Sequence, residues 1–173
     1  YGTMYSKEMS LKGRTFMKKI LCSTGAIIGI PNGRDYRLLE PLSKQLTCDG
    51  FEFMMYSSWY EKLEDIKGFL QGLKLFIPVF HCEKSIGEYI SKGSEEDLGE
   101  AFRRFEINCD LAKTLGAEKL VLRLWSGQVS DSNFQSNLAA YPRLREIVDS
   151  YGLVLGIENV VCNVENPMKH LQE

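Results

Sequence analysis

Several polar side chains that can do chemistry lie directly after short apolar runs of the sequence. The run at 153–157, for example, is followed at once by an acid. If these runs are strands of one parallel sheet, their carboxyl ends meet at a single edge, which is where the active sites of parallel barrels lie. The side chains that the sequence predicts at this edge are Ser23, Thr24, Glu52, Tyr56, His81, Arg123, Trp125, Glu158 and Asn159.

Glu158 is the most informative of these residues because it ends an almost wholly apolar run, Leu-Val-Leu-Gly-Ile. A charged group at the end of a buried strand persists when it is paired or bound to a metal. Glu158 is therefore a candidate metal ligand or proton acceptor. The alternative is that Glu158 lies just beyond the strand, in water.

The two tryptophans of the chain, Trp59 and Trp125, both follow predicted strand ends. An aromatic face at the mouth of a barrel commonly packs against the apolar face of a sugar ring. The alternative is that both indoles fill the hydrophobic core, which is the commoner position of a tryptophan.

Short apolar runs alternate with longer helical patterns along the chain, which is typical of repeated βα units around a parallel sheet. We expect Asp35 and Ser94 to cap helices and Gly116 to end one. Pro167 is expected to open a last helix. The predicted strands cover residues 20–24, 51–56, 73–81, 120–125 and 153–157, and the predicted helices cover 35–46, 59–70, 94–115 and 138–151.

Pro78 is the one residue that conflicts with this pattern, because it lies in the middle of the predicted third strand. Proline has no backbone N–H to donate to a central ladder. We therefore expect a bulge or a shortened strand there.

Composition favours a single globular domain. The 173 residues are 44% hydrophobic and 25% charged, and no apolar run approaches the length of a membrane span. The net charge of −2 is spread along the chain, which disfavours nucleic acid as a partner. The five cysteines are widely spaced, so we expect neither a disulfide framework nor a zinc ribbon. We expect instead a reducing, cytoplasmic location.

Residues 1–16 carry no apolar periodicity, whereas the segment from Met17 leads directly into the first predicted strand. We interpret 1–16 as an N-terminal extension, of cloning origin or native, and 17–173 as one domain.

Four sequence segments together resemble the xylose isomerase-like barrel superfamily, which includes sugar phosphate isomerases and epimerases, inosose dehydratase-like enzymes and endonuclease IV. The resemblance runs from Lys19 to about Glu173. It implies an α/β fold, a (β/α)8 TIM barrel of which this chain carries the first five βα units. The segments are Asp49-Gly50-Phe51-Glu52, His81, 115–122 and Gly156-Ile157-Glu158-Asn159.

The resemblance implies catalytic and metal-binding roles for Glu158 and His81. Glu158 matches the glutamate of the fifth strand, which binds a divalent metal and takes part in proton transfer in epimerases. His81 matches a histidine that binds metal in the endonucleases and lies beside the substrate in several isomerases, although a hydrogen bond to a neighbouring loop is an equal alternative. The expected cofactor is Mn2+, Mg2+ or Zn2+ in a site that this chain completes only in part.

Arg123 departs from the endonuclease pattern, which has a zinc-binding histidine on the fourth strand. A guanidinium cannot ligate a metal but suits a carboxylate or phosphate. The alternative is an ion pair with Glu52 or Glu158. The residues predicted to bind substrate are Arg123, Trp125, Asn159, Glu52 and Trp59.

The resemblance, taken with these residues, implies a metal-dependent isomerase or epimerase acting on a sugar or sugar phosphate. The alternatives are an abasic-site endonuclease of the endonuclease IV type and a non-catalytic binding barrel. An open five-stranded sheet would leave one edge unpaired. We therefore expect either self-association that covers Val154 and Leu155, or further residues after Glu173 that complete the barrel and supply most of the metal ligands.

Overall fold

A computed structural model of the chain describes residues 19–128, 131–166 and 168–172. All neighbouring strands of its 5-stranded sheet run parallel, in the order β1-β2-β3-β4-β5. This is the strand order of consecutive βα units, and it is consistent with the first five units of a barrel, as predicted. The strands are β1 (Leu21–Ser23), β2 (Gly50–Met54), β3 (Val79–His81), β4 (Lys119–Leu122) and β5 (Val154–Ile157).

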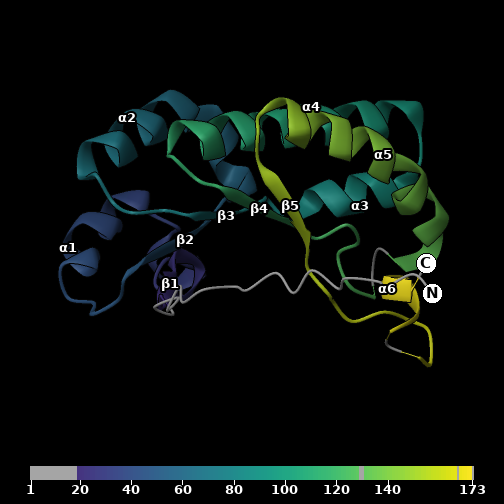
Figure 1. The fold of residues 1–173 in the computed structure, drawn as a ribbon, viewed down its shortest axis with the longest axis horizontal. Coiled ribbons are helices and arrows are strands. Elements are labelled where there is room, and N and C mark those ends of the chain that lie inside the picture. Colours follow the sequence, from purple (N-terminus) through teal and green to yellow (C-terminus); the bar gives the residue numbers. More distant parts are fainter. Residues whose placement is uncertain (1–18, 129–130, 167, 173) are drawn as a thin grey trace, which may run out of the picture.

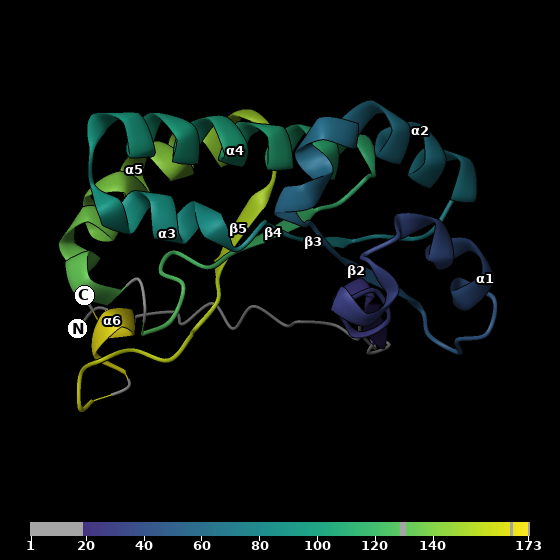
Figure 2. The ribbon, with the colours of Figure 1, turned by 180° about the vertical axis from the view of Figure 1, so that it is seen from behind.

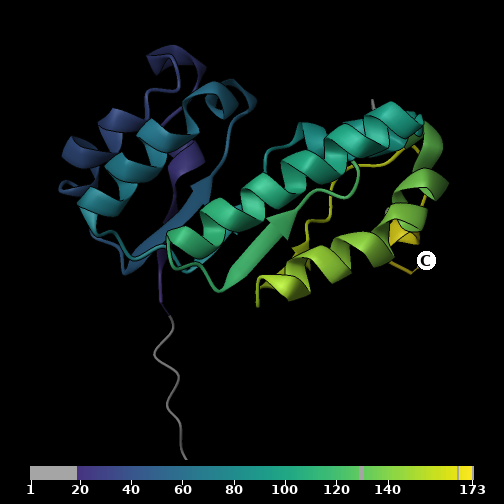
Figure 3. The ribbon, with the colours of Figure 1, turned by 90° about the horizontal axis from the view of Figure 1, so that it is seen from above.

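The described helices are α1 (Leu39–Ser43), α2 (Leu63–Leu73), α3 (Ser85–Lys92), α4 (Glu95–Thr114), α5 (Phe134–Ser150) and α6 (Lys169–Gln172). Figures 1 and 2 show α2, α4 and α5 along one face of the sheet. Contacts join α2 to α4 and α4 to α5, and Figure 3 shows the three following the sheet in chain order. None of these described helices is long and apolar enough to cross a membrane.

The hydrophobic core lies between the sheet and these helices. Side chains alternate along a strand, and Phe53, Phe80 and Leu120 point to the helices with no exposed surface. The register aligns Glu52 with Val79, Val79 with Lys119, and Lys119 with Val154, which places these residues on the opposite face. That face is partly open, because 62% of Val154 is exposed.

Strand β3 is much shorter than the predicted run of 73–81, and Pro78 is the reason. The strand begins only at Val79. Pro78 contributes its carbonyl alone, which accepts hydrogen bonds from the backbone N–H groups of Glu118 and Lys119. The shortened strand that the proline predicted is therefore confirmed.

Helix α4 has the ends that the sequence predicted. The Ser94 hydroxyl accepts a hydrogen bond from the backbone N–H of Asp97 at 3.1 Å, which satisfies a free donor of the first turn. Gly116 follows the helix with a φ of +78°, a conformation that favours glycine.

The sequence prediction missed α3, a helix that precedes α4 in a segment expected to be loop. Gly87 interrupts the helical pattern of this eight-residue segment. Its close approach to β4 explains the glycine, because a side-chain carbon there would meet the backbone oxygen of Arg123 at 2.5 Å.

The other boundaries differ in smaller ways. The predicted helix 35–46 is a 3₁₀ helix, Tyr36–Leu38, followed by the short α1, although Asp35 caps it by accepting a hydrogen bond from the Arg37 N–H. Helix α5 begins before the predicted 138 because Phe134 is buried. The predicted extension 1–16 and the helix start at Pro167 lie outside the described residues.

The packing of α3 on the end of β4 can be tested by Gly87→Ala. The added carbon would meet the carbonyl oxygens of Arg123 at 2.5 Å and Leu124 at 3.0 Å. We expect a loss of about 1–3 kcal/mol in the free energy of unfolding, measured by urea denaturation.

Gly99→Ala is the matched control, since Gly99 is also helical and a carbon there would meet nothing within 4 Å. It should stabilise the protein by up to about 1 kcal/mol. Equal effects of the two substitutions would contradict the close approach of α3 to β4.

Candidate functional site

Three of the predicted site residues meet at the carboxyl edge of the sheet. His81 is the last residue of β3, and Arg123 and Glu158 each follow the last residue of a strand. The register pairs Leu122 with Ile157, so the residues that follow them, Arg123 and Glu158, lie side by side. The Glu158 N–H donates to the Leu122 carbonyl at 2.9 Å and extends this ladder by one residue.

Arg123 and Glu158 form a bidentate ion pair. Arg123 Nε lies 2.6 Å from Glu158 Oε2, and Arg123 Nη2 lies 3.0 Å from Oε1. This fork geometry is the strong form of a guanidinium–carboxylate contact. Of the two partners that the sequence left open for Arg123, the structure selects Glu158.

His81 completes the cluster from the neighbouring strand. Its Nε2 lies 2.7 Å from Glu158 Oε2, and its Nδ1 lies 2.8 Å from the Cys82 carbonyl oxygen. A carbonyl only accepts, so Nδ1 must carry a hydrogen, and Nε2 is the nitrogen that faces the carboxylate. The ring itself is 3% exposed, so its orientation is fixed by the fold.

These contacts keep Glu158 ionised. The hydrogen bonds from Arg123 lower the pKa of Glu158 to about 2, and His81 adds to this effect, while partial burial of the carboxyl opposes it. The same pair raises the pKa of the Arg123 guanidinium. The negative charge of Glu158 is therefore held against the guanidinium of Arg123 and the imidazole of His81.

A divalent metal does not fit this donor set as it is arranged. Glu158 and His81 offer two ligand groups, but the guanidinium of Arg123 holds both oxygens of Glu158. A guanidinium cannot ligate a metal, and its positive charge opposes a cation. We therefore derive no chemical step through a metal at this cluster.

Both tryptophans lie in the core. Trp59 is 3% exposed and its Nε1 donates to the Arg34 carbonyl at 2.9 Å, while Trp125 is 1% exposed. Burial removes the large apolar area of each indole from water. Neither ring presents a free face to a sugar in this structure, which corrects the expectation that they stack on substrate.

The other two predicted substrate residues do not join the cluster. Glu52 pairs with Val79, two residues before His81 on the same face, and is half-buried. Asn159 follows Glu158 and is exposed. Their roles stay predictions.

A second polar cluster escaped the sequence prediction. Asp131, Cys162 and His170 bring their ligand atoms within 4.8 Å of one another. Asp131 begins a 3₁₀ helix after β4, Cys162 follows β5, and His170 lies in α6. The three match no short spacing motif, and Cys162 was interpreted only as a buried thiol. No local signal in the sequence joins them.

The chain has little similarity to known proteins. No protein-family model and no curated protein sequence matches the chain. Among solved structures, it is similar to a D-allulose 3-epimerase from Methylomonas sp., with 17% identity and a TM-score of 0.47. The match covers 65% of this chain and 41% of that one. The parallel strand order establishes the fold class independently of this likeness.

Proposed function

We propose that the protein is an isomerase or epimerase that acts on a sugar or sugar phosphate. The observation that carries this proposal is the convergence of Glu158, His81 and Arg123 at the carboxyl edge of parallel strands. A carboxylate beside an imidazole at such an edge is suited to moving a proton at a carbon next to a carbonyl.

In the proposed mechanism, Glu158 accepts the proton from the carbon next to the sugar carbonyl. His81 Nε2 lies within hydrogen-bond reach of the same carboxylate. With a hydrogen on Nε2 as well as on Nδ1, His81 donates from Nε2 to the carbonyl oxygen as negative charge develops there. Return of this proton from Glu158 to the neighbouring carbon gives an isomer. An epimer forms when water or a second acid delivers a proton to the opposite face of the first carbon, and the proton on Glu158 is then released to solvent.

The ion pair argues for an anionic substrate. A carboxylate with a pKa of about 2 is a weak base, and an efficient general base has a pKa closer to the working pH. A phosphate or carboxylate group of the substrate that took over the donors of Arg123 would free Glu158 and raise its pKa. The substrate itself would then activate the base.

Solvent exchange tests this proposal with a range of candidate sugars at once. The protein is incubated in D2O with a panel of ketoses, aldoses and their phosphates, and deuterium at carbon is followed by NMR. We expect incorporation next to the carbonyl, faster for phosphorylated than for neutral sugars. No exchange above the protein-free rate across the panel would contradict the proposal.

The sequence predicted dependence on a divalent metal, and the same assay tests that prediction. Mn2+, Mg2+ or Zn2+ is added to one set of samples and EDTA to another. Exchange that requires a metal and survives Glu158→Gln would assign the chemistry to a different site.

A further inference from the structure

Asp131, Cys162 and His170 form a compact cluster of metal-ligating groups outside the Glu158 site. Their ligand atoms all lie within 4.8 Å of one another. The side chains of Asp131 and His170 are 1% and 5% exposed, and Cys162 is also buried. A carboxylate, a thiol and an imidazole seldom share a buried space unless they interact, because each costs free energy to desolvate.

The contacts around the cluster hold the donors in place. Asp131 Oδ1 lies 2.5 Å from His170 Nε2, and Asp131 Oδ2 accepts a hydrogen bond from the backbone N–H of Asn163. The imidazole is stacked on Phe134 with ring centroids 3.6 Å apart, and the edge of Trp125 lies against it. In metal sites, contacts of this kind orient the side chains that bind the metal.

The hydrogen bonds within the cluster leave ligand capacity unused. His170 Nδ1 is buried and finds no hydrogen-bond partner among the described residues. The Cys162 thiol makes only a long contact, 3.8 Å, with the Val164 carbonyl oxygen. A buried sulfur is therefore available beside the Asp131–His170 pair, and one ring nitrogen of His170 is left without a partner among the described residues.

We propose that Asp131, Cys162 and His170 bind one divalent cation of the zinc class. Thiolate, imidazole and carboxylate are the ligands that Zn2+ takes in proteins, whereas Mg2+ and Ca2+ prefer oxygen ligands alone. The described residues supply three donors, which leaves the fourth corner of a tetrahedral site to water or a bound ligand.

Binding would change the cluster in a defined way. The Cys162 thiol loses its proton to solvent. The cation displaces the proton between Asp131 and His170 Nε2, and that proton passes to His170 Nδ1 or to solvent. Ligand bonds of about 2.1 Å at a tetrahedral angle separate the two atoms by about 3.4 Å. The present 2.5 Å contact must therefore open by less than an ångström.

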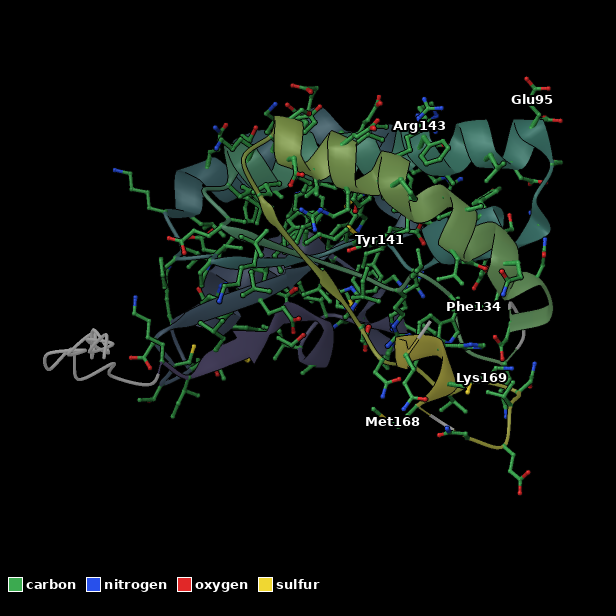
Figure 4. The ribbon with its side chains drawn as sticks, turned by 45° about the vertical axis from the view of Figure 1, so that its right-hand side comes forward. Glu95, Phe134, Tyr141, Arg143, Met168 and Lys169 are labelled. Atoms are coloured by element: carbon green, nitrogen blue, oxygen red, sulfur yellow. The ribbon has the colours of Figure 1, made fainter. Side chains whose placement is uncertain are left out.

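The site would clamp two segments at the carboxyl edge of the sheet. Asp131 follows β4, whereas Cys162 and His170 follow β5. Figure 4 shows α6, marked by Lys169, beside Phe134 at the start of α5. The Asn163 amide already donates to the Gln128 carbonyl at 2.7 Å between the same two segments.

The competing possibility is a buried hydrogen-bonded pair that stabilises these loops without a metal. Protein treated with EDTA and dialysed is titrated with Zn2+ by calorimetry and with Co2+ by absorption spectroscopy. We expect one equivalent per chain, and a thiolate-to-Co2+ charge-transfer band in the near ultraviolet. Cys162→Ser should abolish the band and weaken metal binding at least about tenfold. Asp131→Asn and His170→Gln should each weaken metal binding by a similar factor.

Controls separate this site from other thiols and from the proposed catalytic site. Cys22 and Cys48 lie close enough to interact electrostatically, so a Cys22→Ser/Cys48→Ser variant tests them as an adventitious pair and should bind normally. Glu158→Gln should also bind Zn2+ normally, whatever it does to sugar chemistry.

Two outcomes would overturn the metal site. One is the absence of stoichiometric binding at micromolar Zn2+ or Co2+, and the other is unchanged affinity in Cys162→Ser. The latter variant keeps the size of the side chain and removes no short hydrogen bond, so it should fold, which circular dichroism checks. A His170→Gln variant that loses stability while no form binds metal would favour the structural pair.

Discussion

Glu158→Gln is expected to lower the rate of deuterium exchange into the sugar at least about a hundredfold, the usual contribution of a positioned general base. The amide keeps the shape of the carboxylate but cannot accept a proton from carbon. It also leaves the half-buried Arg123 without its ionic partner. We therefore expect a loss of about 1–2 kcal/mol in stability, between the values for exposed and buried pairs.

Glu165→Gln is the matched control for this result. Glu165 follows the same strand but is exposed, so neither exchange nor stability should change. Rates are compared at a temperature where circular dichroism shows both variants fully folded. Wild-type exchange in folded Glu158→Gln would remove Glu158 from the mechanism.

Acid is expected to erase the stabilisation that Arg123 provides. The pKa of Glu158 is depressed to about 2 from an ordinary 4.5. The ionised carboxylate therefore contributes stability above about pH 4.5, and this contribution is lost as the pH falls from there toward 2. The full shift corresponds to about 3 kcal/mol, and with the carboxylate 31% exposed we expect about 1–2 kcal/mol after solvent screening.

Urea unfolding of the wild type and Arg123→Met at several pH values between 7 and 3 measures this effect. The pKa of Glu100 is also held at about 2, by Arg103 and Arg104, so the wild type alone cannot isolate Glu158. The difference between the two proteins can, and it should shrink as the pH falls below 4.5. A difference that stays constant with pH would contradict the ion pair.

The strand ends could be predicted because apolar runs followed by polar residues mark them directly. His81 and Glu158 were placed at one edge by this rule, and the parallel register confirms their proximity. The partner of Arg123 could not be chosen from the sequence, since Glu52 and Glu158 both lay on predicted strands. Only the pairing of Leu122 with Ile157 decides it.

Features that depend on packing between distant segments were not predicted. Helix α3 was missed because Gly87 weakens the helical pattern of the segment. A glycine is needed there because a side chain would meet the backbone oxygen of Arg123, which is distant in the sequence. Trp59 and Trp125 were ambiguous, since an aromatic after a strand fits both a core and a sugar site. The Asp131–His170 contact spans 39 residues and leaves no local trace.

A crystal structure of the protein with a bound sugar would show whether Glu158 and His81 face the reacting carbon. The sugar used is the one that exchanges deuterium fastest in the panel. We expect its carbonyl carbon and the adjacent C–H to lie against Glu158 and His81 at the carboxyl edge of β3 and β5, with any phosphate on Arg123. A sugar bound elsewhere, with the Arg123–Glu158 pair intact and closed to it, would contradict the proposed site.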